Sequence, residues 1–170
     1  MKPPMWAPWR MEYILGPKEK GRCVFCVYES HGPGEFRADG TLFASDQAFV
    51  TLNRYPFAAA HLLVIPRRHV SRLTDLEPGE HDALFQLVTA TAARLEKAVK
   101  CEGMNVGINI GASAGAGIAE HLHVHLVPRW SGDNNFMPVL ADVRVMPQAL
   151  EKTWEHLAPF FADLAGTHPS

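Results

Sequence analysis

The histidine-rich run at residues 120–130, EHLHVHLVPRW, constrains this chain more than any other stretch. His121, His123 and His125 recur at every second position, with apolar residues between them. In an extended strand, alternate side chains point to opposite faces, so successive imidazoles would lie roughly 7 Å apart on one face. Three interpretations are open: a polar strand face with satisfied histidines, a metal cluster, or a catalytic face that handles phosphate.

Length and composition narrow the class of protein. The chain has 170 residues, enough for one domain with a proper core, and its 47% hydrophobic and 20% charged content is ordinary for a globular protein. A formal charge of -2 gives no overall basic surface for nucleic acid. No apolar run approaches the roughly 20 residues that span a bilayer. Three cysteines suit a reducing compartment, so we expect a cytoplasmic protein that binds neither membrane nor nucleic acid.

The N-terminal third contains an aromatic arm and a cysteine pair. Residues 1–22 combine tryptophans with prolines, and we expect them to anchor an arm on the body or on a second subunit. Cys23 and Cys26 can hold one zinc ion through a tight turn, but they could also be a redox pair or two reduced thiols. Glycines and a proline make residues 31–40 a predicted surface loop.

Hydrophobic periodicity predicts the regular elements. We expect two strands with a turn in residues 42–52, a short apolar strand at 61–65, and an alternating strand at 105–110. Residues 78–100 carry an apolar stripe at helical spacing and form the one long helix, while 147–164 predict a C-terminal helix that Pro159 kinks or breaks.

Two polar segments could meet a phosphate. Residues 67–69, Arg-Arg-His, are either a solvated turn or a group of cations or metal ligands near phosphate. Residues 111–117, GASAGAG, form a small-residue loop whose main-chain N–H groups can approach an anion closely. With Ser113 in this loop and the histidines next in the chain, it predicts a phosphate cradle.

The motif HLHVHLV resembles the signature of the histidine triad (HIT) family, in which three histidines alternate with apolar residues. Asn53 and the segment HLLVIPRRHVS resemble an upstream part of that family, and NVGINIG resembles its phosphate-binding segment. The likeness covers about residues 20–130. MWAPWRMEYI near the start and WSGD after the triad resemble the branch of diadenosine tetraphosphate phosphorylases, or ATP adenylyltransferases.

The resemblance implies an α+β fold with an antiparallel sheet of about five strands and the long helix packed on it, and a homodimer that joins two sheets. The expected organisation is a single HIT domain over residues 1–170, with an arm at 1–22, a core at 23–130 and a C-terminal extension at 131–170.

The resemblance also implies the site. His123 would attack the α-phosphorus of an adenine nucleotide and form a nucleotidyl-imidazole, with His125 and His61 contacting phosphate or orienting His123. Asn53 would contact the ribose. The phosphate-binding residues would be Asn109, Ser113, Gly117 and His125, and no catalytic metal is required. We also expect Phe43 and Leu52 to sandwich the base.

The zinc-bearing branch of the superfamily implies a ligand set of Cys23, Cys26, His69 and His121. Two thiolates and two imidazoles make a closed tetrahedral structural zinc site. The competing interpretation leaves the cysteines reduced and His121 free to form hydrogen bonds within the triad. Cys101 has no role in either.

Several activities fit these residues. The expected one is phosphorolysis of diadenosine tetraphosphate to ADP and ATP. A dinucleoside polyphosphate hydrolase and a nucleoside phosphoramidase would use the same nucleophile. A nucleotide-binding signalling protein with little turnover is an alternative of another class. A hydrolase of adenylated nucleic acid would need a basic groove or an added module, which the charge of -2 does not favour.

Overall fold

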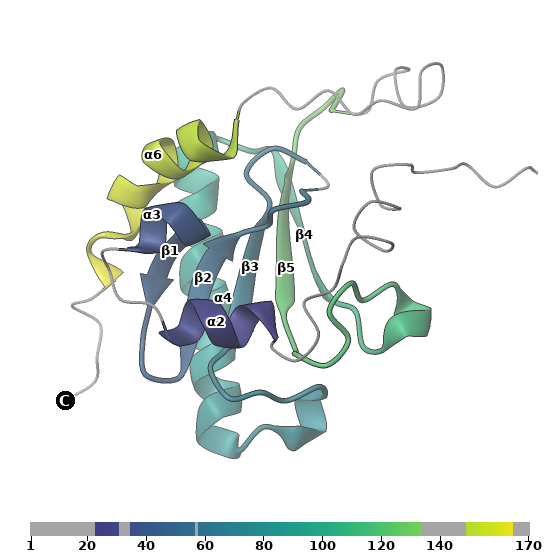
Figure 1. Cartoon of the computed structure of the whole chain (residues 1–170). Coiled ribbons are helices and arrows are strands. Elements are labelled where there is room, and N and C mark those ends of the chain that lie inside the picture. Colours follow the sequence, from purple (N-terminus) through teal and green to yellow (C-terminus); the bar gives the residue numbers. More distant parts are fainter. Residues whose placement is uncertain (1–22, 31–34, 57, 134–148, 165–170) are drawn as a thin grey trace, which may run out of the picture.

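A computed structural model describes residues 23–30, 35–56, 58–133 and 149–164 of the chain. Its centre is an antiparallel sheet of five strands in the order β1-β2-β3-β5-β4, and the five antiparallel strands agree with the family resemblance (Figure 1). The strands are β1 (Thr41–Ala44), β2 (Ala48–Leu52), β3 (Leu62–Pro66), β4 (Gly103–Ile108) and β5 (Val124–Arg129). The expected arm at 1–22 lies outside the described residues.

The long helix covers one face of the sheet (Figure 1). Helix α4 (Pro78–Val99) begins with Pro78 in its first turn and buries six side chains. They are Leu84, Leu87, Val88, Thr91, Leu95 and Ala98. The helix ends at Lys100, which adopts a left-handed φ of 48°, rather than at a glycine. The main core lies between this helix and the sheet.

The second long helix, α6 (Leu150–Phe161), packs against α4 and β1. It buries Leu157 and Phe161, and the Trp154 Nε1 donates to the main-chain oxygen of Thr41 at 2.7 Å. Pro159 lies within this helix, so the break predicted there is wrong. In the described part of the chain, no helix is both long and apolar enough to cross a membrane.

The structure contains two short helices that the sequence did not predict. Helix α2 (Val24–Ser30) begins directly after Cys23, so the cysteine pair brackets a helical turn and not an isolated tight turn. Helix α3 (Phe36–Asp39) lies within the predicted 31–40 loop and ends at Gly40, whose φ is 77°. Two 3-10 turns, Leu73–Asp75 and Ala112–Ala114, complete the described elements.

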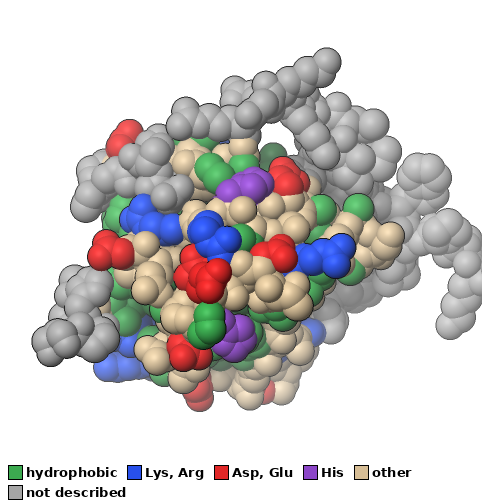
Figure 2. Space-filling model, turned by 90° about the horizontal axis from the view of Figure 1, so that it is seen from below, with side chains coloured by type: hydrophobic (Ala, Val, Ile, Leu, Met, Phe, Trp, Pro, Cys, Tyr) green, Lys and Arg blue, Asp and Glu red, His purple; other side chains and the backbone are tan. Residues whose placement is uncertain are grey.

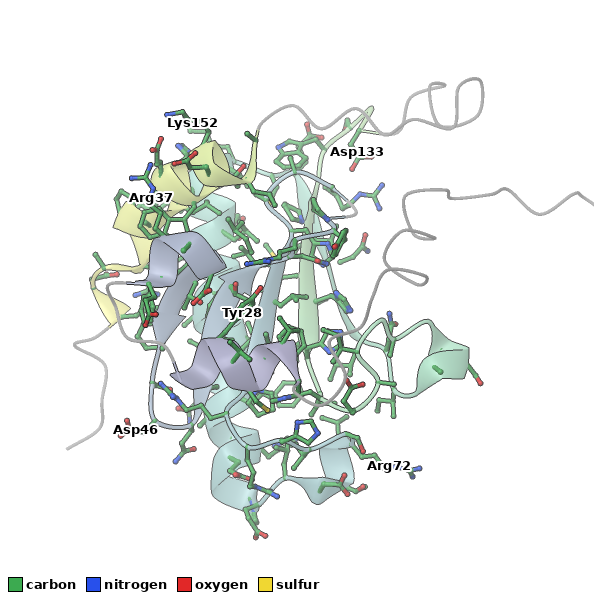
Figure 3. All side chains as sticks on the ribbon, viewed as in Figure 1. Tyr28, Arg37, Asp46, Arg72, Asp133 and Lys152 are labelled. Carbon is green, nitrogen blue, oxygen red and sulfur yellow. The ribbon has the colours of Figure 1, made fainter. Side chains whose placement is uncertain are left out.

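Helix α2 gives the sheet a second, smaller core on the face away from α4 (Figures 1 and 3). Phe25 and Tyr28 from this helix pack on Phe49, Leu63 and Ile65 of the sheet. Because side chains alternate along a strand, β2 and β3 contribute to both cores and are buried along their whole length. The face under α2 is also the one to which His125 points, since Val124 and Leu126 belong to the main core.

Candidate functional site

The three histidines do not form one continuous strand. Strand β5 begins at Val124, so only His125 lies in the sheet, and His121 and His123 precede it. The main chain there bonds elsewhere, because Leu122 N donates to the Val70 oxygen at 2.6 Å. The period-two spacing predicted the alternation but not this departure from the sheet.

His123 is held as one neutral tautomer. Its Nδ1 lies 2.8 Å from the main-chain oxygen of His121, and a carbonyl oxygen can only accept, so Nδ1 carries the hydrogen. The side chain is 5% exposed, and burial is the main reason its pKa lies below the ordinary value, although the bond to the carbonyl opposes this. His123 is therefore neutral near pH 7, with the lone pair on Nε2.

His125 has the opposite tautomer because of a chain of hydrogen bonds that starts at Tyr55. The main-chain N–H of Tyr55 donates to Asn53 Oδ1 at 2.9 Å, which fixes the orientation of the amide. Asn53 Nδ2 lies 3.3 Å from His61 Nδ1 and 3.5 Å from His61 Nε2, and His61 Nε2 lies 3.0 Å from His125 Nδ1. Taking the shorter amide contact as the hydrogen bond, we assign the His61 hydrogen to Nε2, which then donates to His125 Nδ1. Since His125 accepts at Nδ1, its hydrogen is on Nε2.

This chain unites three sequence-predicted residues, Asn53, His61 and His125, and adds Tyr55. His61 is 1% exposed and lies against His125, with ring centroids 5.1 Å apart, whereas we expected it to contact phosphate or orient His123. Asn53, expected at the ribose, directly contacts His61. The role of Tyr55 main chain carried no sequence signal, since every residue but proline has an N–H.

Strand β4 places a glycine beside the histidines. Gly107 pairs with His125, and a Cβ built on Gly107 would meet no described residue within 4 Å. Asn109 follows the end of β4, next to the Ile108–Val124 pair and close to the start of β5. Ser113, in the 3-10 turn Ala112–Ala114, and Gly117 are exposed. The glycine-rich loop thus follows the strand that borders His125.

The predicted base pocket is wrong. Leu52 is 4% exposed within the main core, and Phe43 packs against that same core. Both therefore lie on the α4 face of the sheet, whereas His125 points to the α2 face. The β-hairpin was the correct element, but a shift in register between Thr41 and Phe43 and the alternation of β2 turn these two side chains away.

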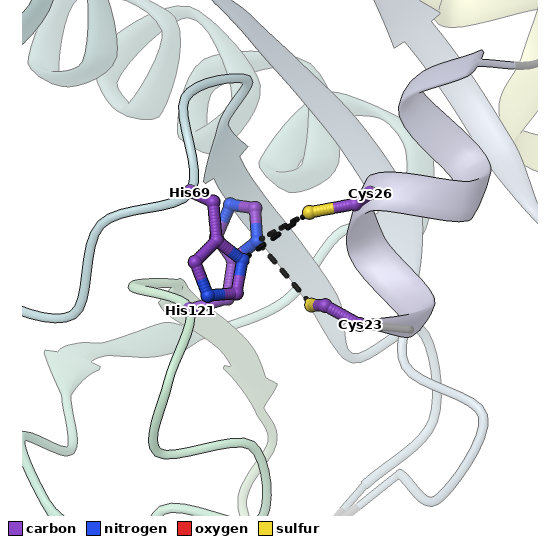
Figure 4. A group of neighbouring side chains, drawn as sticks. All are labelled: Cys23, Cys26, His69 and His121. Carbon is purple, nitrogen blue, oxygen red and sulfur yellow. Dashed lines mark hydrogen bonds between the residues drawn. The ribbon is translucent and has the colours of Figure 1, made fainter. Parts of the chain in front are cut away.

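Cys23, Cys26, His69 and His121 come together as a metal-binding group (Figure 4). Their ligand atoms all lie within 4.8 Å of one another. His121 Nδ1 is 3.4 Å from the Cys23 Sγ and 3.6 Å from the Cys26 Sγ, and His69 Nδ1 is 3.2 Å from the Cys26 Sγ. Tetrahedral zinc bonds would hold sulfur and nitrogen roughly 3.5 Å apart. The four residues fit a structural zinc ion.

His121 is oriented for such a site from outside the ligand shell. Its Nε2 lies 2.8 Å from the main-chain oxygen of Pro66, so Nε2 carries the hydrogen and Nδ1 presents its lone pair to the sulfurs. Burial is the main cause that lowers the pKa of His121. The side chain is fully buried, whereas His69 is exposed, so one edge of the group reaches the surface.

The arginines beside His69 have local partners. Arg67 Nε donates to the main-chain oxygen of Ser45 at 2.5 Å. Arg68 forms an ion pair with Glu80 at 2.6 Å and lowers the pKa of that carboxyl to about 2. Figure 2 views the molecule from below and shows cationic and anionic side chains next to each other on this face. These contacts favour a structural turn that carries His69.

The comparisons agree with this geometry. The model of the HIT domain matches residues 37–132. The AP-4-A phosphorylase of Mycobacterium tuberculosis is 35% identical over 163 residues, covering 93% of this chain and 84% of that protein. A bis(5'-nucleosyl)-tetraphosphatase (asymmetrical) of Schizosaccharomyces pombe is 42% identical over 86 residues, covering 51% of this chain and 46% of its own.

A solved structure resembles the whole fold. The Zn-bound histidine triad family protein from Mycobacterium smegmatis superposes with a TM-score of 0.65 at 26% identity, covering 86% of this chain and 97% of that one. The family match spans more than half of this chain and includes the three histidines. The chain therefore belongs to the histidine triad (HIT) family.

Proposed function

We propose that this protein is an enzyme that transfers a nucleotidyl group from a dinucleoside polyphosphate, with His123 as the nucleophile. The preferred reaction is phosphorolysis of diadenosine tetraphosphate to ADP and ATP. The observation that carries the proposal is the bond from His123 Nδ1 to the His121 oxygen, because it leaves a neutral Nε2 with its lone pair available.

The reaction has two displacements. The Nε2 lone pair of His123 forms a bond to the α-phosphorus, and the bond from that phosphorus to the bridging oxygen breaks, so the electron pair leaves with ATP. An oxygen of inorganic phosphate then attacks the same phosphorus, the P–N bond breaks, and ADP departs while His123 recovers its lone pair. The Nε2–H of His125 would donate to a phosphate oxygen as charge develops there.

The surrounding residues support this division of roles. The contacts of His61 with Asn53 and His125 support the assignment of the His125 hydrogen to Nε2. We assign Asn109, Ser113 and Gly117 to phosphate binding because their segment follows the strand that borders His125. Asn53, at the rim of the same face, would contact the ribose as well.

We also propose that Cys23, Cys26, His69 and His121 bind a structural zinc ion. The donor set and its spacing support this, and the closed set of four ligands leaves no open position for a substrate. When bound, zinc would join helix α2 to the segment before β5. The nucleotidyl transfer proposed here involves only protein side chains.

A homodimer joined through the sheets is the third part of the proposal. In the described residues, β4 pairs with β5 on one side only, and its Val106 is 50% exposed. Ile110, just beyond the strand, is 44% exposed. Apolar side chains on an unpaired strand favour association with a second sheet edge.

The test is product analysis with diadenosine tetraphosphate, with and without inorganic phosphate. ADP that forms only with phosphate supports the phosphorylase. His123→Asn should abolish turnover and keep nucleotide binding, while His81→Asn, which changes an exposed histidine on α4, should leave turnover intact. Absence of product from dinucleotides would refute the transfer proposed here, and absence of product from both dinucleotides and phosphoramidates would refute an enzyme of either kind.

The alternative is hydrolysis, which the likeness to the S. pombe tetraphosphatase favours. Water would then take the nucleotidyl group, and AMP plus ATP would appear without phosphate. The same incubation separates the two reactions, since the nucleophile is common to both. A phosphoramidase would instead cleave a nucleotide–amine bond, which a phosphoramidate substrate tests.

A further inference from the structure

Phe25 lies between the two cysteines of the metal-binding group and contacts two of the triad histidines. Its ring centroid is 5.3 Å from that of His123, with the planes tilted by 60°, and 5.5 Å from that of His121, edge to face. Sequence reasoning missed this residue, because an apolar residue in a Cys-x-x-Cys motif carries no signal for a role at a nucleophile.

One hydrogen bond alone does not hold the imidazole ring of His123 in a fixed orientation. The bond from Nδ1 to the His121 oxygen fixes the tautomer only while the imidazole keeps its orientation about the Cβ–Cγ bond. Rotation of the ring about this bond would remove the hydrogen bond and move Nε2. Among the described residues, the rings that adjoin His123 are those of Phe25 and, at 4.9 Å, His125, and both limit the rotation.

Phe25 is itself firmly held. It is 4% exposed and packs with Phe49, Leu63 and Ile65 in the smaller core. The cysteines on either side place its main chain next to the metal-binding group, and Val27 N donates to the Cys23 oxygen at 3.2 Å in the first turn of α2. Its ring therefore has a fixed position relative to both the core and the cysteine pair.

We propose that Phe25 is a positioning residue that holds the imidazole plane of His123 and thereby keeps Nε2 directed at the α-phosphorus. The inference rests on the proposed nucleophilic role of His123. It assigns helix α2 a part in the reaction through the packing of Phe25 against the His123 ring.

The experiment compares Phe25→Leu with Phe49→Leu. Phe49 is 1% exposed in the same smaller core, so both variants lose aromatic packing there, but only Phe25 has a ring contact to His123. Phe25→Met, whose flexible side chain has a volume similar to that of Phe but no ring, replaces Phe25→Leu as the test variant if Phe25→Leu folds poorly. Zinc content is measured for each variant so that an effect on the ring is separated from loss of the metal.

The first readout is the NMR chemical shifts of the two ring ¹⁵N atoms of His123, which differ widely when the neutral ring has one fixed tautomer. We expect them to converge in Phe25→Leu, at unchanged zinc content, and to stay apart in Phe49→Leu. Unchanged shifts in Phe25→Leu and Phe25→Met would overturn the proposal. This readout needs no substrate, so it tests Phe25 even if the wild-type protein turns over no dinucleotide.

The second readout is the split between kcat and KM. Misplacing a nucleophile lowers the chemical step, so Phe25→Leu should lose about tenfold in kcat with KM within about twofold. Phe49→Leu should keep kcat within about twofold of wild type. A raised KM with unchanged kcat in Phe25→Leu would instead mean that this side chain contacts the nucleotide, and would also overturn the proposal.

Discussion

His123 and His125 are two residues apart, yet their Nδ1 atoms have opposite roles: one donates a hydrogen bond and the other accepts one. The role of His123 Nδ1 is set by a carbonyl oxygen, which can only accept. The role assigned to His125 Nδ1 follows, through His61, from the Asn53 amide that the Tyr55 N–H orients. The two imidazoles therefore present different Nε2 atoms to a phosphate, a lone pair and an N–H.

At this scale, Asn53→Leu tests the hydrogen-bond chain. Without the amide, His61 loses the donor that keeps its hydrogen on Nε2, so His125 no longer has a fixed tautomer. We expect kcat to fall about tenfold or more at saturating substrate, since one phosphate donor is lost. Steady-state kinetics measures it, with Gln47→Leu as an exposed control. A kcat equal to that of the control would contradict the chain.

Among the elements, α2 depends most on its surroundings. Seven residues are too few for a helix to be stable alone, so α2 must be held by the smaller core and by the cysteine pair. Helix α4 is different, since it has 22 residues and its own buried stripe. Loss of the metal should therefore affect α2 first.

Cys26→Ser tests this dependence. Removing one of four ligands should lower bound zinc well below one per chain and lower the melting temperature, because α2 loses its anchor. Metal analysis and thermal unfolding measure both, and Cys101→Ser, outside the group, should match wild type. Treatment with a chelator should destabilise wild type but hardly change Cys26→Ser. Full zinc content in Cys26→Ser would refute the site.

The turn before α4 gives a pH-dependent prediction. Glu80 accepts from Arg68 and from Glu77 N, and its pKa falls from 4.5 to about 2 in the folded protein. Since the folded state holds its proton more weakly, the pair stabilises the fold above about pH 4.5, and this is lost as pH falls towards about 2. Glu80→Gln should cost less than about 1 kcal/mol at pH 7.

Urea unfolding at pH 7 and pH 3 measures that loss. The difference between wild type and Glu80→Gln should shrink at the lower pH, because at pH 3 Glu80 is protonated in the unfolded chain while it stays mainly ionised in the folded one, which favours unfolding of wild type. Glu96→Gln, an exposed change on the same helix, should show no such trend. A difference of equal size at both pH values would show that the charge of Glu80 is not its cause.

The sequence correctly predicted those helices and strands whose hydrophobic periodicity is set by their own residues. The stripe in α4 and the alternation in β4 set the period of each element, and both elements are present. Helix α3 was missed because it is only four residues long among glycines. The start of β5 was missed because the alternation of His121, Leu122 and His123 says nothing about which main chain bonds to Leu122.

Some features of the candidate site could likewise be predicted from the sequence, and others could not. The group of four candidate metal ligands followed from the family resemblance and is present in the structure, whereas the contact of His61 with His125 was not predicted. Phe43 and Leu52 were misplaced because a single shift in register decides which face a side chain takes. The effect of Phe25 on His123 is a contact between rings 98 residues apart in sequence, which no local pattern reveals.

For the whole molecule, the side of β4 that has no partner strand among the described residues is where the proposed dimer would form. The proposed dimer would cover Val106, which is 50% exposed. Val106→Lys should place two like charges at the joint and shift the protein from dimer to monomer, as measured by light scattering. Leu150→Lys, an exposed apolar position on α6, should leave the mass unchanged. A monomeric wild type would refute the dimer.

The oxygen that fixes the tautomer of His123 belongs to the main chain of residue 121. A substitution at residue 121 therefore leaves this hydrogen-bond acceptor in place. A change of the His121 side chain can remove a metal ligand, but every amino acid supplies the same carbonyl. The tautomer of the nucleophile is therefore fixed by a main-chain atom, which no side-chain substitution at residue 121 removes. Only a change in the path of the chain before β5 could withdraw that oxygen.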